Sequence, residues 1–251
     1  MASAPSLRTH DGDERLPMLL GFQRVADNTA RQTRFMDHGR GIYVYDTDGR
    51  EYIEATASFY VAGLGYQHEE LIDAIHAQYR ELPFFVSALN RTTRVALELA
   101  EKLVARVPVP DAHLLFAATG SEAIDFLVKL IWFQSVARGT PGKRTIVGRH
   151  GSYHGATLGS ASLTGGHHEE FGLPLPDFRH VSQPDYHGHR QPGESAADYA
   201  QRLARELEAL LEREPRDSVA AFITEPMSFS AGFRVPPPAY FPALTRVLAD
   251  H

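Results

Sequence analysis

Short apolar runs alternate with amphipathic helical patterns over the second part of this chain of 251 residues. The apolar runs cover residues 113–117, 144–147, 178–181 and 219–223. The helical patterns cover residues 121–137, 198–214 and 240–249. Such alternation predicts an α/β fold in which helices cover a mostly parallel sheet, because parallel strands need long crossover connections. Ligands of such folds collect at the carboxyl ends of the strands, so polar motifs that follow the apolar runs are candidate binding residues.

The first part of the chain has a different pattern. The stretch GIYVYDTDGREYIEAT contains two β-branched and aromatic runs separated by Thr47, Asp48 and Gly49. An Asp-Gly pair between such runs predicts a β-hairpin. Apolar residues then recur at helical spacing over residues 69–79 and 93–106. Residues before about Leu16 are polar and irregular, and we expect an N-terminal arm there.

Composition excludes several classes of protein. With 31 acidic and 25 basic residues, the chain has no basic excess for binding nucleic acid or an anionic membrane. It contains no cysteine, so it has no disulfide, thiol nucleophile or cysteine-bound metal. The beginning of the sequence has no apolar signal region, and its longest apolar run is too short to span a bilayer. We therefore expect a soluble, cytoplasmic protein.

The motif TGSEA follows the apolar run at 113–117 and begins a helix. Thr119 and Glu122 have the spacing of a capping box, so the motif could serve only to start the helix. The same geometry also suits an anion site, because the free amides and the positive end of the helix dipole face outward. Gly120 lets the backbone approach such an anion, and the hydroxyl groups of Thr119 and Ser121 add donors.

Two further motifs, SYHG and ITEP, also follow predicted strands. The ring of Tyr153 could stack on a planar cofactor, or it could be an ordinary rim aromatic beside a surface histidine, His154. Glu225 could bind a cationic ring or a substrate ammonium group. Taken singly, it could equally be a strand-terminal charge in water.

In their order and spacing, the three motifs resemble those of class III aminotransferases, a branch of the fold-type I pyridoxal phosphate enzymes that includes omega-amino acid:pyruvate transaminases. The similar blocks run from DGREYIEATASFYVAGLGYQHEELIDAI through TGSEAIDFLVKL and GSYHGATLGSASLTG to ITEPMSFSAGFRVPPPAYF. The resemblance implies an α/β fold of the fold-type I transferase kind, with part of a smaller α+β domain, incomplete at its carboxyl end. Residues 1–68 would form the N-terminal arm and part of the small domain, and residues 69–251 the first part of the large cofactor domain.

The resemblance also implies roles for individual residues. The cofactor, pyridoxal 5'-phosphate, would have its phosphate at the TGSEA motif, Tyr153 stacked on its ring and Glu225 near that ring. The cofactor-binding set is then Thr119, Gly120, Ser121, Tyr153, His154 and Glu225. The substrate pocket would be lined by Tyr60, Phe84, Phe85 and Phe229. Phe229 stands where the family usually has glycine, and we expect it to crowd or reshape the pocket.

The lysine that forms the Schiff base in this family has no counterpart in the chain and would belong beyond His251. The three lysines present are poor substitutes. Lys129 lies nine residues beyond Gly120 on the same predicted helix, roughly 13 Å along its axis. Lys102 fits the solvated face of a helix, and Lys143 fits a turn.

The resemblance implies an aminotransferase that moves an amino group from an amine or omega-amino acid donor to an oxo acid acceptor such as pyruvate. This chain alone would be inactive, and its partner would be a second copy in a homodimer or a missing carboxyl-terminal half. Aminomutases, racemases and decarboxylases share these motifs, and a non-catalytic half-chain that binds the cofactor or a partner polypeptide is another alternative. Histidine pairs beside acidic residues match no zinc spacing, so we expect no metal site; they are His167, His168, His187 and His189, near Glu169, Glu170 and Asp185.

Overall fold

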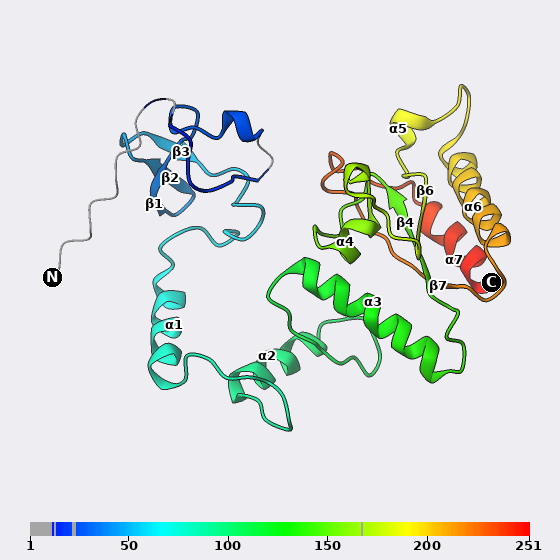
Figure 1. Ribbon diagram of the computed structural model, residues 1–251, viewed down its shortest axis with the longest axis horizontal. Coiled ribbons are helices and arrows are strands. Elements are labelled where there is room, and N and C mark those ends of the chain that lie inside the picture. Colours follow the sequence, from blue (N-terminus) through cyan, green and yellow to red (C-terminus); the bar gives the residue numbers. More distant parts are fainter. Residues whose placement is uncertain (1–11, 13, 22–23, 167) are drawn as a thin grey trace. The chain divides into compact units, whose positions relative to one another are not determined.

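The computed structural model describes residues 12, 14–21, 24–166 and 168–251, so most of the expected N-terminal arm lies outside the described residues. The chain divides into two compact units, Met1–Lys102 and Leu103–His251 (Figure 1). The boundary that we predicted at residue 68 concerns the domains of a complete enzyme and stays a prediction.

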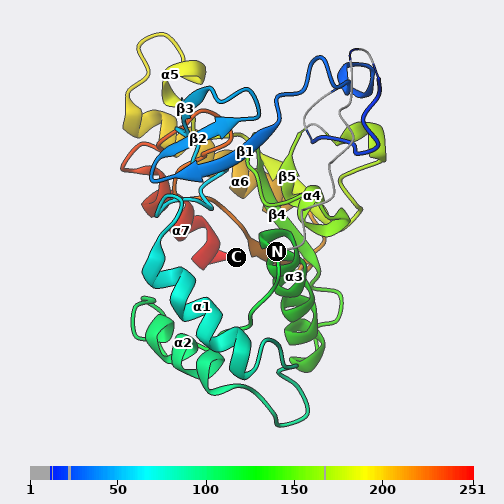
Figure 2. The same cartoon turned by 90° about the vertical axis from the view of Figure 1, so that its left-hand side faces the viewer.

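The first unit contains a three-stranded antiparallel sheet in the order β1-β2-β3 (Figure 2). Its strands are β1 (Met36–Arg40), β2 (Tyr43–Asp46) and β3 (Glu51–Ile53). The Asp46 carboxylate accepts hydrogen bonds from the backbone N–H groups of Asp48 (3.0 Å) and Arg50 (2.9 Å) and from the Tyr52 hydroxyl (2.7 Å). These bonds hold the turn between β2 and β3, so the hairpin predicted from the Asp-Gly pair is confirmed.

Helices follow this sheet along the chain. They are α1 (Glu69–Glu81) and α2 (Arg94–Val104), and a short 3-10 helix, η1 (Val25–Asp27), precedes the sheet. Both α-helices were predicted from apolar spacing, and their observed ends differ from the predicted ends by at most two residues. Helix ends commonly vary by this amount because the terminal turns fray.

The second unit contains a four-stranded parallel sheet with β4 (Thr145–His150) at its centre. On one side β4 pairs with β6 (Phe178–Val181). On the other side it pairs with β7 (Val219–Phe222) near its start and with β5 (Thr164–Gly165) at its end. The predicted parallel sheet is confirmed.

Helices cover both faces of this sheet (Figure 1). On one face lie α3 (Gly120–Ala137) and α4 (Leu158–Leu163), and on the other lie α6 (Ala196–Arg213) and α7 (Tyr240–Asp250). Two short helices, η2 (Glu169–Phe171) and α5 (Tyr186–His189), occupy connections. Alternation along the strands separates two cores. Ile146 and Phe178 pack beneath α3 with Val128, whereas Val147 and Val181 pack against α6 and α7.

The strand predicted at residues 113–117 is wrong, since the structure has no strand there. The run leads into α3 with its apolar side chains exposed, 37% for Leu114, 56% for Leu115 and 51% for Phe116. A strand is stabilised by hydrogen bonds to a neighbouring strand, and among the described residues nothing pairs with this run. The run is apolar, but no described part of the chain covers its side chains.

Candidate functional site

The amino end of α3 lies in the second unit and carries the TGSEA motif. Thr119 is the N-cap, and its hydroxyl accepts a hydrogen bond from the Glu122 N–H (3.1 Å). The Glu122 carboxylate accepts in return from the N–H groups of Ala118 (2.9 Å) and Thr119 (3.2 Å). The capping box is therefore present, and the N–H groups of Gly120 and Ser121 remain in the first turn, where no earlier intrahelical acceptor exists.

The loop that carries SYHG lies against this helix end. The Ala156 N–H donates to Ser121 Oγ at 3.0 Å, which leaves the proton of the Ser121 hydroxyl available for another acceptor. Gly155 has φ +138°, and a Cβ there would lie 2.6 Å from Ser121 Oγ and would also clash with Ser160. By contrast, a Cβ at Gly120 would meet no atom of the described residues within 4 Å, so these residues leave the space in front of this helix end open. Only glycine at 155 allows the two motifs to approach this closely.

Glu225 connects the third motif to the same loop. Its carboxylate Oε2 accepts a hydrogen bond from the Tyr153 N–H at 3.4 Å. Tyr153 is 46% exposed, so its ring is accessible to a ligand. Residues from the ends of β4 and β7 thus meet at the carboxyl edge of the sheet, where ligands of α/β folds bind.

A buried arginine supports this contact. Arg149 in β4 is 0% exposed, and its Nη2 donates to the Glu225 carbonyl oxygen (3.0 Å) and to Ser228 Oγ (3.1 Å). The same Nη2 lies 3.7 Å from Glu225 Oε2. Its Nε and Nη1 have no hydrogen-bond partner among the described residues. Tyr240 of α7 lies close by, with its hydroxyl likewise buried and unpaired in the described part of the chain.

His154 faces inward rather than toward the open side. Its N–H donates to Thr164 Oγ1 (2.9 Å), and its ring Nε2 is buried without a partner among the residues described. Burial, together with the positive charges of Arg149 and His180, lowers the pKa of His154 to about 4. A neutral imidazole supporting the loop fits this setting, and a direct role in holding a cofactor stays a prediction.

The ring of Phe229 packs against that of Phe233 in a tilted arrangement, with ring centroids 4.2 Å apart and an interplanar angle of 52°. The loop between them closes through a bridge of Ser228 with Arg234. Arg234 also binds Gln183 Oε1 at 2.5 Å and Asp185 Oδ2 at 3.0 Å. The aromatic pair therefore belongs to a loop that is fixed at both ends and that begins three residues after Glu225.

The other predicted pocket residues belong to the first unit. Phe84 and Phe85 lie after α1 and are 83% and 45% exposed. Tyr60, 64% exposed, is the last of four consecutive residues with positive φ, at 46°, 48°, 54° and 76° for Ala57 to Tyr60. Left-handed backbone in residues other than glycine is strained, and such strain is concentrated at functional sites. The Glu54 carboxylate holds this turn by accepting from the N–H groups of Thr56 (3.1 Å) and Ser58 (3.4 Å).

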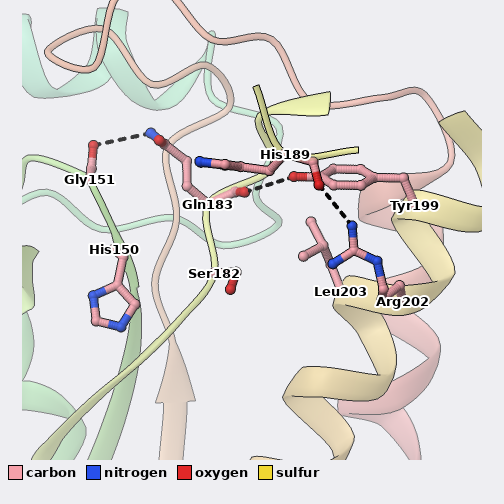
Figure 3. A pocket seen from close by; sticks show the side chains of 8 residues that line it. All are labelled: His150, Gly151, Ser182, Gln183, His189, Tyr199, Arg202 and Leu203. Atoms are coloured by element: carbon pink, nitrogen blue, oxygen red, sulfur yellow. Dashed lines mark hydrogen bonds between the residues drawn. The ribbon is translucent and has the colours of Figure 1, made fainter. Parts of the chain in front are cut away.

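A pocket of about 270 Å³ lies near the carboxyl ends of β4 and β6, apart from the three motifs (Figure 3). Gln183 lines this pocket. Its side-chain Nε2 donates to the Gly151 carbonyl oxygen (3.2 Å), and its main-chain carbonyl oxygen accepts from the Tyr199 hydroxyl (3.1 Å). Arg202 at its edge binds the His189 carbonyl oxygen (3.0 Å) and the Glu194 carboxylate (2.8 Å). Because these polar groups satisfy one another, the pocket offers few free partners to a ligand.

Among the described residues, no three histidine or acidic side chains are grouped so that they could hold a metal ion. His167, one of the histidines considered for such a site, lies outside the described residues. None of the helices that the structure describes is long and apolar enough to cross a membrane.

Neither of the two lysines of the second unit lies at the open end of α3. Lys129 is on the exposed side of that helix, with its Nζ 5.2 Å from the centre of the Phe126 ring. Lys143 precedes β4, at the opposite end of the strand from the SYHG loop, and Lys102 is in α2 of the first unit.

Two residues of this region were missed in the sequence. Asp125 accepts a hydrogen bond from the Ser160 N–H (2.9 Å) and so connects α3 to α4 beneath the SYHG loop. Its position one turn beyond Ser121 was a usable signal. For Arg149 the sequence showed only a charged residue inside an otherwise apolar strand, and this did not predict its partners.

Comparisons with known proteins identify the relatives of this chain. The profile of the family "Aminotransferase class-III" matches residues 25–251. The chain is 37% identical to a probable gamma-aminobutyrate transaminase 3, mitochondrial, of Oryza sativa subsp. japonica, over 100% of this chain and 50% of that protein. It is 38% identical to a vanillin aminotransferase of Capsicum frutescens, over 86% of this chain and 48% of that protein.

Solved structures give the same result. An omega-aminotransferase from Paracoccus denitrificans and a PMP-bound aminotransferase from Vibrio fluvialis each superpose with a TM-score of 0.89 at 37% identity. Both superpositions cover 93% of this chain and 52% of the other. The chain thus spans about half the length of the relatives it matches, and the predicted fold-type I transferase architecture is confirmed. On this combined evidence of sequence and fold, the chain belongs to the class-III aminotransferase family.

Proposed function

We propose that this chain supplies the amino-terminal half of a pyridoxal phosphate-dependent aminotransferase. The observation that carries the proposal is the meeting of three motifs at one edge of the sheet. Ser121 at the end of α3 binds the loop of Tyr153, and the N–H of Tyr153 binds Glu225. The complete enzyme would move an amino group from an amine or omega-amino acid to an oxo acid such as pyruvate.

The residues fit the cofactor. The space in front of Gly120 is open, and the helix amides and the Ser121 hydroxyl can donate to a phosphate. The half-exposed ring of Tyr153 can stack on a pyridine ring, and Glu225 supplies a negative charge beside it. When bound, the cofactor supplies an aldehyde carbon that accepts the amino group and a ring that withdraws electrons from the bond being broken.

In this proposal, residues of the chain bind and orient the cofactor and the substrate. Thr119, Gly120 and Ser121 would hold the phosphate, and Tyr153 would fix the plane of the ring. Phe229, with Phe233 packed against it, would limit the room for a substrate near Glu225. In the complete enzyme, Tyr60, Phe84 and Phe85 would be substrate-pocket residues, and His154 would belong to the cofactor-binding set.

The lysine that holds the cofactor covalently would come from residues beyond those of this chain. We propose that the working enzyme is a homodimer, located in the cytoplasm, although some matched relatives are named as mitochondrial. Gamma-aminobutyrate, an omega-amino acid, and vanillin, an aldehyde, appear in the names of relatives, and the donor used here would be an amine or omega-amino acid.

Binding and turnover test the proposal separately. The chain alone is titrated with pyridoxal 5'-phosphate and followed by quenching of Trp132 fluorescence, with inorganic phosphate as competitor. We expect saturable binding that phosphate weakens and no specific adduct after borohydride reduction, because the family's Schiff-base lysine has no counterpart in this chain. A Ser121→Ala variant, which removes one phosphate donor, should bind more weakly.

Turnover is measured after mixing the chain with a separately expressed carboxyl-terminal half of the Paracoccus denitrificans omega-aminotransferase. Conversion of pyruvate to alanine in the presence of an amine donor supports an aminotransferase. Amine rearrangement, racemisation or loss of carbon dioxide without alanine would replace that assignment with an aminomutase, racemase or decarboxylase. Cofactor binding without any turnover supports a non-catalytic half-chain, and absence of cofactor binding in both preparations contradicts the proposal.

A further inference from the structure

Arg149 is a buried charged residue beside the proposed site, and it belongs to none of the three motifs. Arg149 is fully buried within β4, four residues before Tyr153. Burying a guanidinium is unfavourable unless nearby groups compensate its charge and its N–H donors. The position of its partners therefore indicates what the residue does.

Within the part of the chain that the structure describes, the Arg149 side chain makes its hydrogen bonds and its ion pair with one short segment that follows β7. Nη2 donates to the Glu225 carbonyl oxygen (3.0 Å) and to Ser228 Oγ (3.1 Å), and it lies 3.7 Å from Glu225 Oε2. One guanidinium nitrogen thus holds the backbone, the carboxylate and the following turn of this segment. A shorter or uncharged side chain could not reach all three acceptors.

These contacts extend to the ring-binding side of the site. The same Glu225 Oε2 accepts the hydrogen bond from the Tyr153 N–H at 3.4 Å. The chain then leads back from Tyr153 to Arg149 through Ser152, whose hydroxyl donates to the Arg149 carbonyl oxygen at 2.7 Å. Arg149, Glu225 and Tyr153 therefore form a closed ring of contacts at the end of β4.

Tyr240 of α7 lies near the guanidinium. Burial raises the pKa of the Tyr240 hydroxyl, and the nearby Arg149 charge opposes that rise. The tyrosine is 1% exposed, and its hydroxyl makes no hydrogen bond among the described residues.

We infer that Arg149 is a positioning residue for the proposed cofactor site. It fixes the Glu225 carboxylate and, through it, the backbone of Tyr153, so that the charge and the stacking ring face the same space. This inference rests on the proposed function, because it assigns Arg149 a role in a site that the function requires.

Hydrogen exchange measured by mass spectrometry on the chain tests the inference without a cofactor. The variants are Arg149→Met and Arg149→Lys, and the matched control is Arg179→Met. Arg179, in the neighbouring strand β6, binds Glu214 at 2.6 Å away from the motifs. Conditions are chosen at which circular dichroism shows every variant to be folded.

We expect amides of residues 152–156 and 225–229 to exchange about tenfold faster in Arg149→Met than in the wild type, since local opening becomes easier. Arg149→Lys, which keeps the charge but loses the two-acceptor geometry, should fall between them. Residues 178–181 should be unchanged. Unchanged exchange at both segments, an equal rise in Arg179→Met, or failure of both Arg149 variants to fold would overturn the inference and leave Arg149 a purely structural residue.

A binding measurement separates this inference from the proposed function. Affinity for pyridoxal 5'-phosphate should fall roughly tenfold in Arg149→Met, while affinity for inorganic phosphate at the end of α3 stays within about twofold. An equal loss of both affinities would contradict a role specific to the ring side. If the wild-type chain binds no pyridoxal 5'-phosphate, the proposed function fails for this chain, and the exchange measurement still decides the role of Arg149.

Discussion

Gly155 is the residue at which the phosphate motif and the aromatic motif come into contact. A Cβ at this position would lie 2.6 Å from Ser121 Oγ, and φ is +138°. Gly166 has a comparable φ of +121°, but no atom of the described residues lies within 4 Å of an added Cβ, so it serves as a matched control. Comparing alanine at the two positions separates crowding from backbone strain.

We expect Gly155→Ala to lower the free energy of unfolding by about 1–3 kcal/mol more than Gly166→Ala, because the added methyl must displace the end of α3. Urea denaturation of the two variants measures this difference. Cofactor affinity should also fall in Gly155→Ala only. Equal losses of stability would show that the loop can move away from Ser121 without penalty.

Histidine burial makes the stability of the second unit depend on pH. The pKa of His154 is lowered to about 4 in the folded chain, against 6.5 for an ordinary histidine, and burial also lowers the pKa of His180. At a pH between the unfolded and folded pKa values of His154, this histidine is more protonated in the unfolded chain than in the folded chain. The free energy of unfolding therefore falls as pH decreases from about 6.5 toward 4.

Urea denaturation between pH 7 and pH 5 checks this dependence. His154→Gln should flatten the slope, because the substituted side chain does not titrate, and His180 should account for much of the remainder. His187→Gln, at an exposed position, is the control and should leave the slope unchanged. A slope that is the same in all three proteins would contradict the assignment to His154.

At the scale of elements, comparing the side-chain N-caps of two helices separates the effect of a cap on phosphate binding from its effect on the stability of the chain. Thr119 caps α3 at the proposed phosphate site, whereas Ser195 caps α6 by accepting from the Asp198 N–H at 3.1 Å. We expect Thr119→Ala and Ser195→Ala each to lose about 1 kcal/mol of stability. Only Thr119→Ala should weaken phosphate binding, measured by calorimetry. A similar weakening in Ser195→Ala would mean that the effect reflects stability alone.

Elements that depend on local chemistry were predictable, and those that depend on distant partners were not. The Asp48-Gly49 turn and the helix at 120–137 follow from residues close in sequence, and both were confirmed. The run at 113–117 has strand character, yet a strand also needs a neighbour, and the described chain provides none. For the same reason the contacts of Arg149, made with residues 76 and 79 positions away, could not be predicted from the strand that contains it.

At the scale of the whole molecule, α3 buries one face and exposes another that is strongly apolar. Phe126, Leu130 and Phe133 recur at i, i+4 and i+7 and are 38%, 54% and 70% exposed. An apolar stripe of this kind on a helix normally contacts another element or another chain. The chain covers only about half the length of its relatives, so the remaining half is the natural source of that contact.

We therefore expect the chain alone to associate reversibly with itself as its concentration rises, since self-contact would remove this stripe from water. Sedimentation velocity over a range of concentrations measures the effect. Phe133→Lys should reduce self-association, whereas Phe171→Lys, which removes an equally exposed phenylalanine outside α3, should not. Phe133→Lys should also reduce the alanine formed when the chain is mixed with a carboxyl-terminal half, because the stripe would be the docking face for that half. A Phe133→Lys chain that complements as well as the wild type would show that α3 faces solvent in the assembled enzyme.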